Sequence, residues 1–175
     1  PGIYSLSPYT LEEVVTRNYL IKECPDAIIN IVDGTNIERN LYLTTQLLEL
    51  GIPVIIAINM IDIVHKRGDE INLQWLGDFL GCEVLETSAL KGQGSVGVAE
   101  RAIQLVKEKK SVKISHMFDG VVEHALAHIE ESIETIVPAD KLRWYAIKVF
   151  ERDEKILAEL TLEATLKTHL EEHIK

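Results

Sequence analysis

The chain has 175 residues, of which 46% are hydrophobic and 26% are charged, and its formal net charge is -10. This length and composition fit one soluble globular domain with a core, with or without a small satellite. The acidic balance argues against nucleic acid or an anionic membrane surface as the main partner, because both are polyanions. No apolar run approaches the roughly 18 residues of a spanning helix. Two separated cysteines, Cys24 and Cys82, indicate a reducing compartment rather than a disulfide framework.

Strand patterns alternate with helix patterns over the first two-thirds of the chain. Thr10 and Glu13 have the spacing of a capping box, which predicts a helix over 11–23. Asn36 is placed to cap a second helix that Gly51 ends. The other expected elements are strands at 27–33, 53–59 and 83–87 and helices at 37–50, 71–80 and 95–110. The strands are nearly continuous apolar runs, which predicts parallel neighbours in one sheet with helices on both faces.

The pattern changes near residue 112, after which no strand-like run occurs. Helical stretches are expected at 115–136, 140–151 and 154–174, with Pro138 between the first two. Their apolar residues recur at helical spacing, as Leu142, Tyr145, Ala146 and Val149 and as Ile156, Leu157 and Leu160. We therefore expect an α/β domain over 1–111 and a small all-α subdomain over 112–175, packed beside it and without a ligand site.

Polar clusters follow all three expected strands, at the edge where open parallel sheets bind ligands. They are Asp33–Asn36, Asn59–Asp62 and Thr87–Lys91. In isolation, Asn-x-x-Asp could be only a turn and a helix cap. Together with the apolar strand before it and the later Ser-Ala pair, it resembles the guanine-recognition elements of GTPases.

The chemistry of these residues suits guanine. The Asp62 carboxylate can accept both the ring N–H and the exocyclic amine of guanine, a pair of donors that adenine lacks. The Asn59 amide would serve the far edge of the base and tie neighbouring loops together. Backbone N–H groups at Ser88 and Ala89 can donate to the guanine oxygen, and Met60 lies inside the first motif.

Two further stretches make the resemblance specific to one family. Pro1-Gly2-Ile3-Tyr4-Ser5-Leu6 is similar to the end of the Asp-x-Pro-Gly-x-Tyr-Ser-Leu segment of FeoB-type ferrous iron transporters. The stretch 30–44 is close to the same family's sequence, and the helical tail with Trp144 and Tyr145 also matches. The likeness covers essentially the whole chain.

The resemblance implies a P-loop GTPase-like sheet, truncated at its N-terminus, followed by a helical subdomain. It implies GTP or GDP as ligand, with Gly2 also at the nucleotide, and Mg²⁺ held mostly by residues upstream of Pro1. It further implies a membrane-embedded transporter domain in the same polypeptide, at the cytoplasmic face of a prokaryotic inner membrane, and a homo-oligomer as one assembly. No G-x-x-x-x-G-K-[ST] motif occurs in residues 1–175, so we expect no GTP hydrolysis by this chain alone. Ile3, where Ras-like enzymes have a glutamine, leaves the catalytic residues unassigned.

Three other patterns are interpreted as structural. Gly92–Gly97 spells G-x-G-x-x-G but follows the last strand, so it is expected to be a loop. The stretch 169–173 matches H-x-x-E-H but lies in a charged helix without a third ligand. His124 and His128 lie one helical turn apart with Glu131 on the same face, and we expect them to face solvent rather than to bind metal.

Two other functions fit parts of the sequence. A GTPase of ribosome assembly or tRNA modification shares the motifs, but it would need a basic RNA-binding appendage that the acidic tail does not supply. A non-catalytic interaction module is the second alternative for this stretch of chain.

Overall fold

The structure is a computed structural model that describes residues 2–6, 10–108, 118–160 and 162–174. The chain divides into two compact units, Pro1–His116 and Met117–Lys175. The first unit consists of α1 (Leu11–Lys22), β1 (Ile28–Asp33), a 3-10 turn (Gly34–Asn36), α2 (Ile37–Glu49), β2 (Val54–Asn59), α3 (Ile61–Arg67), α4 (Leu73–Leu80), β3 (Glu83–Glu86), a second 3-10 turn (Ala89–Lys91) and α5 (Ser95–Glu108).

The three strands form one parallel sheet in the order β1-β2-β3, as predicted. β2 is the central strand, and its first five residues are buried. Their apolar, β-branched side chains suit a strand that is covered on both faces, which explains why the sequence shows no polar alternation. Asp33 at the end of β1 pairs in register with Asn59 at the end of β2. The polar residues after the strands therefore share one edge of the sheet.

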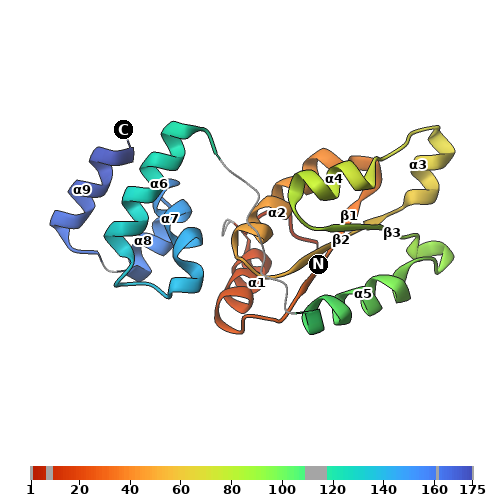
Figure 1. The fold of residues 1–175 in the computed structure, drawn as a ribbon, viewed down its shortest axis with the longest axis horizontal. Coiled ribbons are helices and arrows are strands. Elements are labelled where there is room, and N and C mark those ends of the chain that lie inside the picture. The colour runs from red at the N-terminus through yellow and green to blue at the C-terminus, as the bar shows by residue number, and fades with distance from the viewer. Residues whose placement is uncertain (1, 7–9, 109–117, 161, 175) are drawn as a thin grey trace. The chain divides into compact units, whose positions relative to one another are not determined.

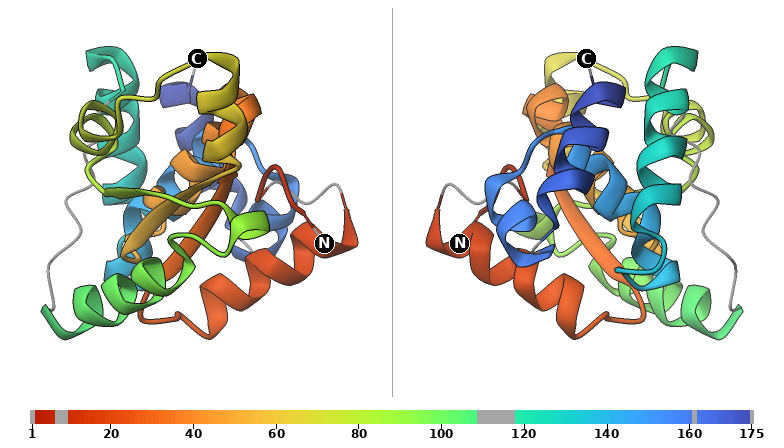
Figure 2. Two further views of the ribbon diagram at one scale, coloured as in Figure 1. Left: turned by 90° about the vertical axis from the view of Figure 1, so that its right-hand side faces the viewer. Right: turned by 90° about the vertical axis from the view of Figure 1, so that its left-hand side faces the viewer.

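Helices cover both faces of this sheet, which confirms the predicted fold class. On one face, Val98 of α5 packs against Ile55 and Ala57 of β2. On the other face, the Asn30 amide of β1 donates to the Thr44 hydroxyl of α2 at 2.7 Å. Figure 1 shows α5 on one side of the strands and α2 and α4 on the other, and the turned views of Figure 2 keep α4 and α5 apart in the same way.

Local signals set the starts of two helices differently. The Thr10–Glu13 capping box is present, because the Glu13 N–H donates to Thr10 Oγ1 at 3.2 Å and the Thr10 N–H donates to Glu13 Oε2 at 3.0 Å. Asn36 occupies the N-cap position of α2, but its side chain makes no cap hydrogen bond. Its amide donates instead to Asp33 Oδ2 at 3.2 Å. Asn36 therefore holds the predicted N-cap position without making the capping hydrogen bond, and its side chain is oriented toward Asp33 instead.

The second unit is helical, as predicted. It contains α6 (Gly120–Ile133), a 3-10 turn (Ala139–Lys141), α7 (Leu142–Phe150), α8 (Glu154–Leu160) and α9 (Ala164–Ile174). α6 packs against both α7 and α9. Its observed start differs from the expected 115, since Asp119 caps it by accepting the Val122 N–H at 3.1 Å, and residues 115–117 lie outside the described part.

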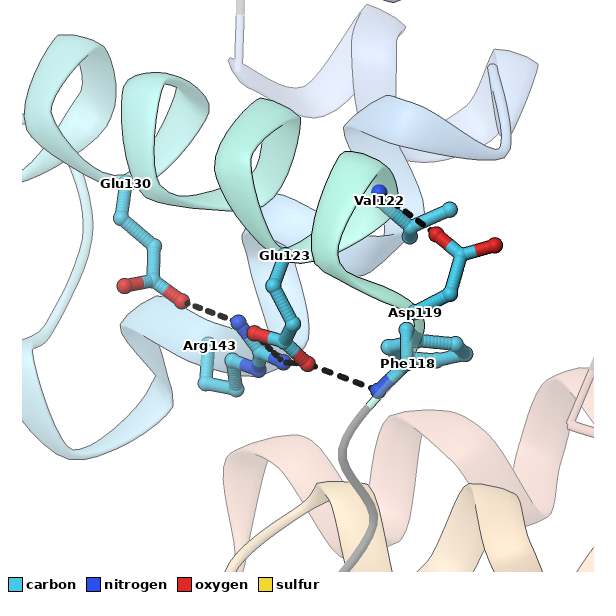
Figure 3. A network of polar contacts seen from close by, with 6 residues as sticks. All are labelled: Phe118, Asp119, Val122, Glu123, Glu130 and Arg143. Atoms are coloured by element: carbon cyan, nitrogen blue, oxygen red, sulfur yellow. Dashed lines mark hydrogen bonds and ion pairs between the residues drawn. The ribbon is translucent and has the colours of Figure 1, made fainter.

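A cluster of ion pairs joins α6 to α7 (Figure 3). Arg143 of α7 donates to both carboxylate oxygens of Glu123 at 2.6 and 2.8 Å, and to Glu130 at 3.1 Å. Glu123 also accepts the backbone N–H of Phe118 at 2.8 Å. This cluster therefore fixes the start of α6 and the α6–α7 contact with the same side chains.

The single helix expected over 154–174 is two helices, which corrects that prediction. Leu162 lies between α8 and α9 and is buried with a relative exposure of 6%. On an unbroken helix, Leu162 would point roughly 120° away from buried Ile156. The interruption therefore lets both side chains reach the apolar interior.

The apolar stripe predicted for this unit is buried at its centre. Tyr145, Ala146, Val149 and Ile156 have relative exposures of 7%, 0%, 1% and 0%, and Trp144, next to the stripe, is buried as well. None of the helices in the described ranges is both long and apolar enough to cross a membrane.

Candidate functional site

The loops after β2 and β3 are joined at the carboxyl edge of the sheet. The Thr87 N–H donates to the Ile58 carbonyl at 2.8 Å, and the Ile61 N–H donates to the Thr87 carbonyl at 3.3 Å. These backbone bonds continue the β2–β3 pairing beyond the last strand residues. They bring the Asn59–Asp62 and Ser88–Lys91 segments side by side.

Side chains reinforce this junction in two places. Asn59 Oδ1 accepts the Ala89 N–H at 2.9 Å. The Ser88 hydroxyl donates to Asp62 Oδ1 at 2.7 Å. The structure thus brings four of the sequence-predicted site residues into one cluster. The Asn59–Ala89 bond ties the two neighbouring loops together, as expected for the Asn59 amide, and it gives the Ala89 N–H, which we expected to face a ligand, an acceptor within the protein.

Met60 links the strand to the next helix. It adopts the left-handed conformation with φ 61° and ψ 27°, and α3 begins immediately after it. This conformation is uncommon for a residue with a side chain, and it lies at the junction of β2 and α3. Asp62 consequently falls in the first turn of α3, next to the loop after β3. The Met60 side chain is 41% exposed at the same edge.

The loop after Ser88 is closed by its own backbone. Ser88 and Gln93 exchange two N–H···O bonds of 3.0 Å each around the 3-10 turn Ala89–Lys91. Gly94 has φ +81°, and a Cβ there would lie 2.3 Å from the Glu86 carbonyl oxygen. The G-x-G-x-x-G pattern therefore forms a tight loop, and its last glycine, Gly97, lies inside α5. This agrees with the loop interpretation.

Lys91 is a fifth member of the cluster, and sequence reasoning gave it no individual role. Its Nζ lies 3.6 Å from Asp62 Oδ2, with side-chain exposures of 54% for Lys91 and 16% for Asp62. The hydrogen bond from Ser88 lowers the pKa of Asp62, and the Lys91 charge lowers it further against the opposing effect of burial. The Asp62 carboxylate is therefore an anion at neutral pH.

Asp33 is at the same edge but is engaged in its own turn. Its Oδ1 accepts the Thr35 N–H at 2.8 Å and the Thr35 hydroxyl at 2.7 Å. Burial raises the pKa of Asp33, but the hydrogen bonds from Thr35 and Asn36 outweigh it, so the net pKa is lowered. These contacts make Asp33 a structural residue of the β1–α2 connection.

Gly2 begins a segment that is attached to α2. It is exposed, and a Cβ built on it would meet nothing within 4 Å. The residues after it are attached to α2, since the Leu6 N–H donates to Gln46 Oε1 at 2.7 Å and the Arg39 guanidinium lies 3.9 Å from the Tyr4 ring centroid. Their described polar contacts are with α2, whereas the Asn59–Asp62 cluster bonds to the loop after β3.

Two histidines of the second unit, His124 and His128, contact each other on α6. The rings of His124 and His128 are edge-to-face with centroids 4.6 Å apart. Within the described residues, no group of three or more His, Cys, Asp or Glu side chains is arranged to hold a metal ion. The His173 side chain of the H-x-x-E-H pattern lies outside the described part.

A parallel sheet with these two loops at its carboxyl edge has the fold of a P-loop GTPase. The chain belongs to the FeoB family: the family profile "Ferrous iron transport protein B" matches residues 1–102, and the profile "FeoB cytosolic helical domain" matches residues 118–175. This membership favours a transporter component over the ribosome- or tRNA-associated GTPase considered from the sequence.

Relatives cover nearly the whole chain. A fusion protein of Fe(2+) transport protein A and Fe(2+) transporter FeoB from Porphyromonas gingivalis is 37% identical over 165 residues, covering 89% of this chain and 19% of the relative. The Fe(2+) transporter FeoB of Escherichia coli K12 is 36% identical over 161 residues, covering 87% of this chain and 20% of the relative. The chain thus spans about a fifth of the length of these curated relatives.

Solved structures of S. thermophilus NFeoB share the fold. The form bound to GDP.AlF4- and K+ superposes with a TM-score of 0.94 at 44% identity, covering 99% of this chain and 68% of that one. The mGMPPNP-bound form gives a TM-score of 0.91 at 45% identity, covering 99% of this chain and 65% of that one.

Proposed function

We propose that this chain is the guanine-recognising part of a GTP-binding and GTP-hydrolysing module that couples nucleotide state to Fe²⁺ uptake. In this proposal, residues 1–111 belong to the GTPase domain. Residues 112–175 pass its state to the membrane-embedded transporter domain of the same polypeptide, at the cytoplasmic face of a prokaryotic inner membrane. A homo-oligomer is the assembly we would test first. The observation that carries the proposal is the Asp62 carboxylate, contacted by Ser88 and Lys91 at the carboxyl edge of the sheet.

The cluster offers complementary groups to guanine. Asp62 retains acceptor capacity on both oxygens, because an ionised carboxylate has about four acceptor sites and Ser88 uses one. These oxygens would receive the ring N–H and the exocyclic amine. The Asn59 Nδ2 group is available for the far edge of the base, since the contact with Ala89 uses only Oδ1. The Ala89 N–H would be shared between Asn59 and the guanine oxygen as a three-centre bond.

Met60 and Gly2 would complete the contacts of this chain. The exposed Met60 side chain stands beside Asp62 and would cover the base with apolar atoms. Gly2 would lie near the phosphates, where a residue without a side chain allows close approach of the backbone.

Hydrolysis would require residues that this chain does not contain. Residues 1–175 have no G-x-x-x-x-G-K-[ST] loop, whose N–H groups and lysine cradle the phosphates. The described residues also offer no cluster of carboxylates for Mg²⁺. We propose that the parent protein supplies both the phosphate loop and the Mg²⁺ ligands, and that the chain by itself does not hydrolyse GTP.

The test is a change of base preference in the full-length protein. Asp62→Asn replaces an acceptor by a donor, which opposes the guanine amine but complements the 2-oxo group of xanthine. Affinity for GTP should fall at least about tenfold, as expected for a lost charge-assisted hydrogen bond, while affinity for xanthosine triphosphate rises. Asp69→Asn, at an exposed position after α3, is the control and should change neither. Unchanged GTP affinity with no gain for the xanthine nucleotide would refute the assignment of Asp62.

A further inference from the structure

The two oxygens of Asp62 have different partners. Oδ1 accepts the Ser88 hydroxyl at 2.7 Å, whereas Oδ2 faces the Lys91 ammonium at 3.6 Å. A single hydrogen bond leaves a carboxylate free to turn about its Cβ–Cγ bond, because terminal torsions of this kind have broad minima. The second contact, to Lys91, opposes that rotation. The plane of the carboxylate is thus set from both sides by one short loop.

The backbone around Lys91 makes its position specific. The Lys91 N–H donates to the Ser88 carbonyl at 3.1 Å, and the Gly92 N–H donates to the Ala89 carbonyl at 3.1 Å. The Ser88–Gln93 pair of hydrogen bonds closes the loop beyond them. Lys91 therefore projects from a closed turn rather than from an open surface strand. The same turn presents the Ser88 hydroxyl, so both partners of Asp62 move together.

The order of groups on guanine indicates which oxygen meets which donor. Along the base edge of guanine, the carbonyl oxygen is followed by the ring N–H and then by the exocyclic amine. If the Ala89 N–H serves the carbonyl oxygen, the neighbouring ring N–H reaches the oxygen on the Ser88 side, Asp62 Oδ1. The exocyclic amine then reaches Oδ2, on the Lys91 side.

We propose that Lys91 is a positioning residue that holds Asp62 Oδ2 toward the exocyclic amine of guanine and thereby sets the preference for guanine over hypoxanthine. This inference rests on the proposed guanine site and adds a specificity determinant to it. The competing interpretation is a solvated surface lysine, which its 54% exposure would also fit. The two interpretations differ in which ligand is affected when the charge is removed.

The experiment compares binding of GDP and inosine diphosphate, which lacks only the exocyclic amine, to the full-length protein. Lys91→Met removes the ammonium and keeps the length of the apolar stem, and Lys91→Arg restores a cation. Lys107→Met, at an exposed position near the end of α5, is the matched control for net charge. For Lys91→Met we expect GDP affinity to fall about threefold to fivefold, the upper part of the range for an exposed ion pair, with inosine diphosphate affinity unchanged. Lys91→Arg should recover most of the GDP preference, and Lys107→Met should behave as wild type.

Each other outcome contradicts a defined part of the argument. An equal loss of affinity for both nucleotides in Lys91→Met would show that Lys91 acts on the fold of the loop. Unchanged affinity for both nucleotides would show that Lys91 is only a surface charge. Either result would overturn the positioning role. A wild-type protein that binds GDP and inosine diphosphate equally would overturn the proposed guanine site itself, and the Lys91 role with it.

Discussion

The Arg143 cluster gives the sharpest test of what stabilises the helical unit. Arg143→Met removes three N–H···O contacts to Glu123 and Glu130 and keeps most of the apolar stem. The side chains involved are only 22% and 28% exposed. Hydrogen bonds to charged groups are worth roughly 1.5–3 kcal/mol, and solvent screens part of this, so we expect a loss of about 2 kcal/mol in the free energy of unfolding. Two carboxylates left without their cation would add to the loss.

The pH dependence of this loss has a defined sign. Burial raises the pKa of Glu123, but the hydrogen bonds from Arg143 and Phe118 lower it more, so the folded pKa lies below the ordinary 4.5. A carboxyl with a depressed folded pKa stabilises the fold above its unfolded pKa, and this stability is lost as pH falls through the folded pKa. The difference between wild type and Arg143→Met should therefore be full near pH 7 and shrink on acidification below about pH 4.5.

Urea unfolding followed by Trp144 fluorescence measures this effect. Trp144 is fully buried in α7, and a Trp75→Phe background removes the other tryptophan, which is 61% exposed in the first unit. Arg152→Met is the matched control, because the Arg152–Glu171 pair is 49% and 46% exposed and should contribute little. The reasoning fails if Arg152→Met costs as much as Arg143→Met. It also fails if the cost of Arg143→Met does not shrink at low pH.

Two further predictions concern the first unit. Gly94→Ala should destabilise it by about 2 kcal/mol or more, since φ is +81° and the new Cβ would meet the Glu86 carbonyl. Gly92→Ala, in open space with φ +64°, should cost only about 1 kcal/mol. Equal losses of the two variants in thermal unfolding would contradict the packing argument. Burial and the neighbouring Glu83 raise the pKa of the Cys82 thiol to about 11, so roughly one part in a thousand is thiolate at pH 8. In thiol labelling of single-cysteine variants, exposed Cys24 should react rapidly and Cys82 at least tenfold more slowly; comparable rates would contradict the burial of Cys82.

The elements that sequence predicted well have a long apolar signal or a clear capping signal. The three strands and α1, α2, α4 and α5 appear within a few residues of their expected bounds. α2, α4 and α5 pack against the strands, and α1 begins at its capping box. α3 was not predicted, since its 7 residues begin directly after the left-handed Met60 and end in His65, Lys66 and Arg67. A helix of two turns is too short to show periodicity.

The sequence also predicted only part of the candidate site. Residue types and order indicated that Asn59, Asp62, Ser88 and Ala89 meet, because the ends of adjacent parallel strands share one edge. They indicated that the Asn59 amide ties the two loops, but not that the Ala89 N–H is the donor, or that Lys91 reaches Asp62. Both facts depend on how tightly the loop after β3 closes, which is set by Gly94 and the Ser88–Gln93 bonds rather than by the motif residues.

The junction between the ends of β2 and β3 has a consequence for how such a protein can change. All members of the cluster lie between Asn59 and Gln93, and their contacts with one another need only the pairing of two adjacent strands. In the proposed complex, residues between Asn59 and Gln93 determine which base is bound, while the phosphate chemistry depends on other parts of the polypeptide. Substitutions between these two residues can therefore alter base preference without changing the groups that perform hydrolysis. Base preference and hydrolysis can thus evolve independently.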